Sequence, residues 1–266
     1  INSKKLIRFN DYKEAINSKP DIVYITLINK LHYKWAKYVL KKGCHLIVDK
    51  PITKKLSEAK ELLKLAKKRR LLLVESTLFN FHNVFNKIEK ILGGNKEIVH
   101  IQSNFNIPTK KSLTQINKID GDNIMDMSAY ASAMIRLYLN RNNTLKVSKI
   151  FFKNSKIVKS FCVLSNDQKK FYFGNFGTER KYLNNIIFFS KKKIVSLNNQ
   201  AFALRPNKKV SLSIQENNTI KKLFVPKDDC IKNFMRDILK TLKTKNFNKY
   251  YDILLYDAKI REKLRQ

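Results

Sequence analysis

Two polar residues that could move a proton, Asp126 and Tyr130, stand four positions apart in a segment whose apolar residues recur with helical spacing. On an α-helix, side chains four residues apart lie on one face, about one turn from each other. A carboxylate and a phenol placed in this way could address one hydroxyl group of a substrate. Oxidation of an alcohol to a ketone needs a group that takes up the hydroxyl proton, and reduction needs a group that returns it.

The stretch from Asp21 to Pro51 is typical of a strand, a helix and a second strand. Residues 22–25 and 46–48 are short apolar runs of the kind found in strands buried on both faces. Between them, apolar residues recur at helical spacing, and Gly43 stands where a helix would end in the left-handed conformation. The stretch therefore predicts one βαβ crossover of a parallel sheet.

The loops that follow these two strands, residues 27–32 and 49–51, are predicted to share one ligand. Ligands of open parallel sheets bind beyond the carboxyl ends of the strands, where both loops would lie. A third candidate, Lys50, belongs to the second loop. Taken alone, a Lys-Pro pair after a strand is simply a turn, and Tyr130 on an amphipathic helix is simply a core residue. Both structural alternatives stay open at this point.

Four motifs carry a family resemblance. Residues 26–32 (TLINKLH) are similar to the pattern A-T-P-N-x-x-H, and residues 49–51 (DKP) are similar to E-K-P. Residues 75–82 (ESTLFNFH) and 121–130 (GDNIMDMSAY) are similar to E-A-F-x-Y-R-F-H and G-G-x-x-x-D-x-G-x-H/Y. In this order and spacing, the chain resembles the family of glucose-fructose oxidoreductase and inositol dehydrogenase, the Gfo/Idh/MocA family. It departs from the patterns at four positions, which are Ile28, Asp49, Asn80 and Asp122.

The resemblance implies hydride transfer between a nicotinamide cofactor, NAD or NADP, and a hydroxyl or keto carbon of a sugar, nucleotide-sugar or cyclic polyol. It makes Tyr130 the acid/base residue, lets Asp126 bind or orient the sugar, and places Lys50 near both. Because an unperturbed tyrosine has a pKa near ~10, we expect the Lys50 ammonium to bring the pKa of Tyr130 toward neutrality. The residues that the resemblance assigns to the cofactor are Thr26, Leu27, Asn29, His32, Asp49, Lys50 and Pro51, among which His32 would shape the loop.

The glycine-rich turn with which complete members begin does not occur in these 266 residues. In the family, that turn holds the cofactor pyrophosphate at a helix N-terminus. Residues 1–20 resemble the stretch that precedes the family's Asp-x-Val-Tyr-Ile strand. We therefore expect that roughly 30 to 40 N-terminal residues are absent, the length of a strand, a helix and a strand. Such a fragment is expected to be inactive and to bind dinucleotides weakly.

The predicted fold is α/β and has two parts. Residues 1–80 would form an incomplete Rossmann domain, a parallel sheet that lacks its first βαβ unit. Residues 81–266 would form an α+β domain for substrate binding and oligomerisation, with a large, mostly antiparallel open sheet. Two helices, at about 228–243 and 249–265, would close the chain. By resemblance, the open face of this sheet implies a homo-oligomer.

The formal charge of +34 could suggest a nucleic acid or an anionic membrane as partner. However, the lysines are scattered along the chain and come with many asparagines and isoleucines, a mixture typical of AT-rich coding. No apolar run reaches the ~18 to 20 residues that span a bilayer, and no Cys/His spacing is typical of zinc. We expect a cytoplasmic protein with no metal, no membrane partner and no specific nucleic acid partner.

Two alternatives from other classes stay open. The departures from the family patterns and the absent glycine turn could mark a noncatalytic relative that keeps the fold for binding or assembly. The charge could instead mark a polyanion-binding protein, whose affinity would fall steeply with salt. An intact upstream glycine motif would favour the enzyme over the first alternative. Discrimination between DNA sequences would favour the second.

Overall fold

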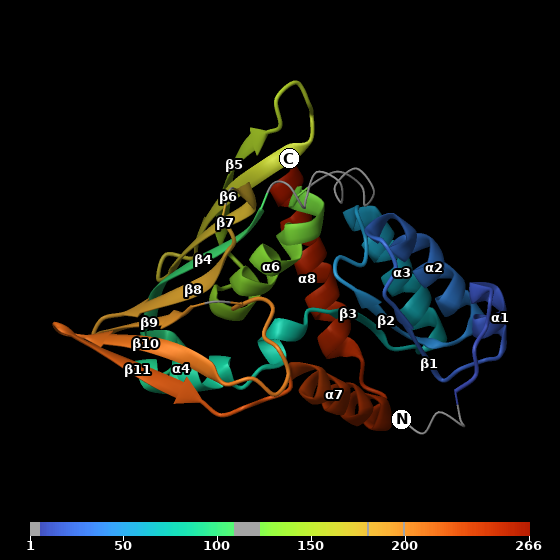
Figure 1. The fold of residues 1–266 in the computed structure, drawn as a ribbon. Helices are drawn as coiled ribbons and strands as arrows, with labels where there is room; N and C mark the ends of the chain where they lie inside the picture. Colours follow the sequence, from blue (N-terminus) through green and yellow to red (C-terminus); the bar gives the residue numbers. More distant parts are fainter. Residues whose placement is uncertain (1–5, 109–122, 180, 199) are drawn as a thin grey trace.

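The protein has two sheets with a long helix between them, in a computed structural model that describes residues 6–108, 123–179, 181–198 and 200–266 (Figure 1). The first sheet has three parallel strands in the order β1-β2-β3. Its strands and the helices that connect and flank them are α1 (Tyr12–Asn17), β1 (Ile22–Ile25), α2 (Asn29–Lys42), β2 (His45–Asp49), α3 (Leu56–Arg69) and β3 (Leu73–Ser76).

The βαβ crossover predicted from the sequence is confirmed. Strand β2 is buried along its middle, as a strand covered on both faces requires. Helix α2 ends at Gly43, whose φ of 87° is left-handed. Glycine has no Cβ to oppose this conformation, and the amide of Gly43 donates to the carbonyl of Leu40 at 3.2 Å. The chain then enters β2 directly, which sets the loop after β2 beside the loop after β1.

The second sheet has eight strands in the order β11-β10-β9-β8-β4-β7-β6-β5. All neighbouring pairs are antiparallel except β4 and β7, which are parallel. Its strands are β4 (Ile98–Pro108), β5 (Thr144–Phe151), β6 (Val158–Asn166), β7 (Phe171–Glu179), β8 (Leu183–Ser190), β9 (Lys193–Leu197), β10 (Val210–Glu216) and β11 (Thr219–Val225). The prediction of a large, mostly antiparallel sheet is therefore confirmed.

Helices cover one face of the eight-stranded sheet and leave the other open. Helix α6 (Asn123–Tyr138) and helix α4 (Val84–Leu92) lie on the same side of the sheet in Figure 1. Their buried residues share one apolar core with the inward-facing residues of the strands, such as Phe161, Tyr172 and Phe188. The short 3-10 helices η2 (Leu78–Phe81) and η3 (Asn95–Glu97) flank α4. This core fixes the face of α6 that carries the candidate residues.

The last two helices, α7 (Cys230–Thr244) and α8 (Asn248–Arg265), return to the first sheet. Residues of both helices pack into the core that surrounds β2, whereas Ile260 and Leu264 of α8 belong to the core of the second sheet. Figure 1 shows α8, in red, running between α6 and strand β3. The division at residue 80 stays a prediction, and α8 contributes to the cores on both sides of it. Among the described helices, none combines the length and apolar character needed to cross a membrane.

Candidate active site

The three residues predicted to be catalytic lie together in the structure. The ammonium of Lys50, in the loop after β2, donates to the Asp126 carboxylate at 2.6 Å and to the Asp126 backbone carbonyl at 2.9 Å. It also lies 4.7 Å from the centre of the Tyr130 ring. Asp126 and Tyr130 are one turn apart on α6, as their spacing predicts. The contact therefore connects the loop after β2 of the first sheet with helix α6, which packs on the second sheet.

Tyr130 packs against three aromatic side chains. Its ring centre lies 5.1 Å from those of Phe105 and Phe202 and 6.1 Å from that of Phe79. Burial raises the pKa of Tyr130, and the opposing effect of Lys50 does not reverse the shift. The expectation that the ammonium would bring this pKa toward neutrality is therefore wrong, because the desolvation of the phenol outweighs the attraction.

Lys50 and Asp126 form an ion pair of unequal exposure. The Lys50 side chain is 17% exposed, whereas that of Asp126 is 48% exposed. Burial alone would lower the pKa of Lys50, but the carboxylate of Asp126 and the phenol of Tyr130 raise it above its ordinary value. At neutral pH the site thus combines a fixed ammonium with a protonated phenol, next to a carboxylate that solvent or a ligand can reach.

His32 connects the two crossover loops. This side chain is buried, and its ring nitrogens lie 2.8 Å from the carbonyl oxygen of Pro51 and 2.7 Å from that of Leu27. Both ring nitrogens face carbonyl oxygens of the protein itself, so His32 shapes the loops and turns no polar atom toward a ligand. The carbonyls of Leu27 and Pro51 are occupied in the same way, and the peptide between Lys50 and Pro51 is cis.

The other residues assigned to the cofactor differ in what they offer. Thr26 is exposed at the end of β1, and Asn29 is half-buried in the first turn of α2. The carboxylate of Asp49 accepts bonds from the Lys50 amide at 2.9 Å and from the Ser76 hydroxyl at 3.2 Å. Thr26, Asn29 and Lys50 can therefore reach a ligand with side-chain polar atoms, while Asp49 orders the turn. Gly121 and Asp122 of the fourth motif lie outside the described residues.

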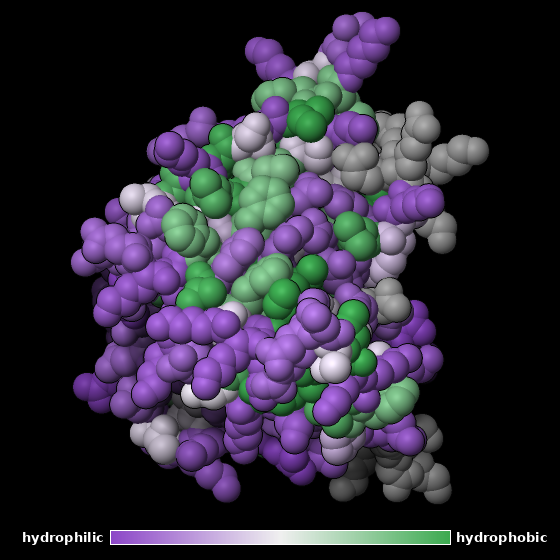
Figure 2. Space-filling view, turned by 90° about the vertical axis from the view of Figure 1, so that its left-hand side faces the viewer, coloured by the Kyte–Doolittle hydropathy of each residue, from purple (hydrophilic) through white to green (hydrophobic). Residues whose placement is uncertain are grey.

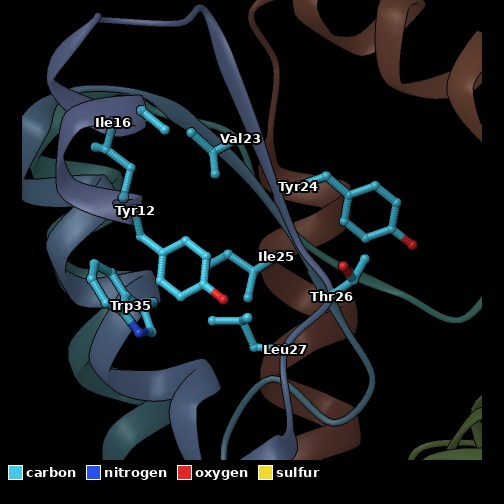
Figure 3. Close-up of a pocket in the computed structure, with 9 residues that line it drawn as sticks. Tyr12, Ile16, Val23, Tyr24, Ile25, Thr26, Leu27 and Trp35 are labelled. Atoms are coloured by element: carbon cyan, nitrogen blue, oxygen red, sulfur yellow. The ribbon is translucent and has the colours of Figure 1, made fainter. Parts of the chain in front are cut away.

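An apolar pocket of about 240 Å³ lies beside β1. Figure 3 shows Val23 and Ile25 turned toward Tyr12 and Trp35, whereas Tyr24 lies across the strand from them. The pocket takes its lining from α1, β1 and α2 and includes neither Lys50 nor the α6 residues. It borders the first crossover loop through Thr26 and Leu27, so it adjoins the predicted cofactor loop and is distinct from the charged contact.

A family model of oxidoreductases with an NAD-binding Rossmann fold matches residues 2–76, which include β1, β2, β3 and both crossover loops. Over these residues the chain is similar to the Gfo/Idh/MocA oxidoreductases. The match covers the first sheet, and the order of the strands and loops agrees with the resemblance seen in the sequence. The matched part is the one that corresponds to an NAD-binding Rossmann fold.

Two of the curated relatives are named for activities on sugars. The chain is 28% identical to a dTDP-3,4-didehydro-2,6-dideoxy-α-D-glucose 3-reductase of Streptomyces violaceoruber over 123 residues, which are 45% of this chain and 36% of the relative. It is 27% identical to D-xylose 1-dehydrogenase (NADP⁺) 2 of Haloferax volcanii over 45% of this chain and 38% of the relative. These matches span between a third and two fifths of the relatives' lengths.

Solved structures share the fold over nearly the whole chain. A 3-ketoreductase of Actinomadura kijaniata, KijD10, in complex with NADP and TDP-benzene, gives a TM-score of 0.87 at 20% identity, covering 97% of this chain and 81% of that one. A UDP-N-acetylglucosamine 3-dehydrogenase of Acidithiobacillus ferrooxidans gives a TM-score of 0.77 at 15% identity, with coverage of 97% and 81%. The chain therefore shares the fold of these two enzymes over nearly its whole length.

Near the site lie four charged residues that are buried or nearly so, of which only Glu75 belongs to one of the four sequence motifs. Arg261 of α8 donates to Glu75 of β3 at 2.6 Å, and both side chains are 3% exposed. Arg136 of α6 donates to Asp257 of α8 at 2.9 Å. A signal for the two α8 residues was present in the sequence, because Asp257 and Arg261 interrupt the apolar stripe of that helix at positions one turn apart.

We predict that Asp257 makes stability depend on pH between 5 and 7. Burial raises its pKa from 3.8 to about 6, although Arg136 and Arg261 oppose the shift. The folded protein thus holds this proton more tightly than the unfolded chain, so the contribution to stability is present at low pH and is lost as the pH rises through about 6. Relative to Asp257→Asn, the wild type should gain about 1 kcal/mol in unfolding free energy from pH 7 to pH 5. Urea denaturation at both pH values measures this difference, and a pH-independent difference would contradict it.

Proposed function

We propose that the protein reduces a keto group of a nucleotide-activated sugar, with NADPH or NADH as reductant. The observation that carries the proposal is the contact of Lys50 with Asp126 and with the ring of Tyr130, at the carboxyl end of β2. This is the edge of a parallel sheet at which ligands bind. The named activities of the curated relatives, and the NADP and TDP-benzene bound to KijD10, support the choice of cofactor and substrate class.

The donor set at the two loops fits a dinucleotide. Thr26 and Asn29 offer a hydroxyl and an amide at the start of α2, where the amides of the first helical turn also favour a polar or anionic group. Ile28 precedes the helix and makes no side-chain capping bond to these amides. Thr26, Asn29 and Lys50 would hold the cofactor, which supplies the hydride when bound. His32, Leu27, Asp49 and Pro51 would keep the loops in place.

The protonation of the site favours reduction. The raised pKa of Tyr130 keeps its phenol protonated at neutral pH, so the phenol can give a proton to a carbonyl oxygen that is becoming a hydroxyl. The ammonium of Lys50 would stabilise negative charge on the same oxygen, because it is fixed and largely desolvated. The Asp126 carboxylate, whose side chain is about half exposed, would accept a hydrogen bond from a neighbouring sugar hydroxyl. Together these groups would orient the sugar and complete the proton transfer.

A homo-oligomer formed through the open face of the large sheet is part of the proposal. Figure 2 shows green apolar side chains gathered between purple polar ones on this face. Leu164, Phe171 and Phe224 are between 44% and 60% exposed there. Exposed apolar area of this kind marks protein contact surfaces. Sedimentation equilibrium would test the assembly, and a monomer at micromolar concentration would refute it.

The decisive experiment is an assay of the protein for turnover of nucleotide sugars. A dTDP-linked 3-keto-6-deoxyhexose should cause oxidation of NADPH or NADH, followed at 340 nm, while the free sugar without its nucleotide should react poorly. Absence of turnover together with retained dinucleotide binding would favour the noncatalytic alternative. Salt-sensitive DNA binding without either property would favour the polyanion-binding alternative.

A further inference from the structure

Helix α8 lies between the two halves of the candidate site. Lys50 comes from the loop after β2, whereas Asp126 and Tyr130 come from α6. Helix α8 packs against α6 on one side and against α3 and β3 on the other, as Figure 1 shows. Any shift of α8 relative to either neighbour would therefore change the separation between the Lys50 ammonium and α6.

One side of α8 is fixed to the Lys50 turn through two buried bonds. Arg261 donates to one carboxylate oxygen of Glu75 at 2.6 Å. The other oxygen of Glu75 accepts the backbone amide of Ile52 at 2.7 Å. Ile52 is two residues after Lys50 and is fully buried. Arg261 thus holds, through Glu75, the backbone from which Lys50 projects.

The other side of α8 is fixed to α6. Asp257 stands one turn before Arg261 and accepts from Arg136 at 2.9 Å, with side chains that are 1% and 15% exposed. Arg136 is on the same helix as Asp126 and Tyr130, six residues after the tyrosine. Two ion pairs, linked by one turn of α8, thus connect α6 with β3. We call these four residues the α8 charge ladder (Arg136, Asp257, Arg261 and Glu75).

The chemistry of the ladder argues for a positional role. Desolvation of buried ions costs so much that apolar residues of similar volume often give equal or greater stability. An ion pair also adds geometric specificity, because its charge-assisted bonds form only when the two side chains are correctly placed. A surface pair on the same helix, Arg265 with Glu262, connects only residues of α8 and provides a contrast.

We propose that Asp257 and Arg261 are positioning residues whose charge ladder holds the Lys50 turn at the distance from α6 that brings Lys50 onto Asp126 and Tyr130. The inference rests on the proposed function for its catalytic consequence and on the described contacts for its geometry. Displacement of a catalytic group by about 1 Å can cost on the order of 10²-fold in rate. The ladder would therefore affect turnover without touching substrate.

The test uses variants of both ion pairs of the ladder. The double variant Glu75→Gln/Arg261→Met removes one pair, Asp257→Asn weakens the other, and Arg261→Lys conserves the charge. Only one terminal nitrogen of Arg261 is bonded, since the other has no partner within the described residues, so lysine can replace the bond to Glu75. Arg265→Met is the matched control on the same helix. Far-UV circular dichroism and a single melting transition establish that each variant is folded.

Two measurements are made on each folded variant. Turnover should fall about 10- to 100-fold in the double variant and in Asp257→Asn, with the KM for the dinucleotide changed less than about 3-fold. The Ile52 amide should exchange its hydrogen at least about 10-fold faster in the double variant, because the side-chain amide introduced by Glu75→Gln is no longer held once Arg261 is replaced. Arg261→Lys should restore most of both properties, and Arg265→Met should change neither.

The outcomes separate the two proposals. Unchanged Ile52 exchange in the folded double variant would overturn the ladder, and so would faster exchange with unchanged turnover. If the wild type itself turns over no nucleotide sugar, the proposed function fails, and the exchange data alone decide whether the ladder holds the Lys50 turn.

Discussion

Replacement of Lys50 by methionine should lower turnover by about 10²- to 10⁴-fold and leave the protein folded. Methionine has nearly the same length and can occupy the channel along which the mostly buried lysine stem runs. The variant removes the two hydrogen bonds to Asp126 and the charge above the Tyr130 ring. Without that charge, the oxygen of a reacting carbonyl loses its electrostatic stabilisation. Steady-state kinetics with saturating dinucleotide and varied nucleotide-sugar measure the loss.

Lys54→Met is the matched control for this substitution. Lys54 lies four residues further along the same loop and is exposed, so its removal takes one positive charge from the same region without touching the site. Its turnover should equal that of the wild type. Equal rates in Lys50→Met and Lys54→Met would refute the role of Lys50.

Tyr130→Phe is the companion variant, with a loss of similar size. Phenylalanine keeps the ring contacts with Phe105 and Phe202 but has no proton to give. Because the phenol is protonated at neutral pH, the variant should lose activity across the whole range below the raised pKa of Tyr130. A variant that retains wild-type rates would return Tyr130 to the role of a core residue.

Local patterns were sufficient to predict the first sheet and the position of its loops. Strand and helix periods over 20 to 30 residues, with one glycine at the helix end, define the crossover and thereby the edge where Lys50 lies. The meeting of Lys50 with Asp126, 76 residues further along the chain, was predicted only through the family motifs. Periodicity carries no information on which distant helix packs against a given loop.

Features that depend on burial or distant pairing could not be predicted in the same way. The sequence indicated many short antiparallel strands but not that β4 would pair in parallel with β7 in the middle of the sheet. The raised pKa of Tyr130 results mainly from burial of its phenol. The sequence argument considered only the nearby Lys50 ammonium and could not include this burial. The partners of Asp257 and Arg261 lie on elements more than 100 residues earlier in the chain.

The second large effect is on stability, and we expect it from Arg261→Met. This single substitution leaves the Glu75 carboxylate buried without its partner, and removal of one member of a buried pair costs about 3–5 kcal/mol. Adding Glu75→Gln should recover most of that loss, because the neutral amide no longer needs a counter-charge. Arg265→Met, which breaks only a partly exposed pair, should cost less than about 1 kcal/mol.

Urea denaturation is measured for the wild type, Arg261→Met, Glu75→Gln and the double variant Glu75→Gln/Arg261→Met. The four unfolding free energies separate the cost of an unpaired charge from the net contribution of the ion pair. If the double variant is much more stable than Arg261→Met, the ion pair contributes little net stability. Its retention in the core is then explained by the position that it gives to Lys50. If instead the double variant is as unstable as the single one, the pair stabilises the fold directly, and the positional role must be judged by the exchange of the Ile52 amide alone.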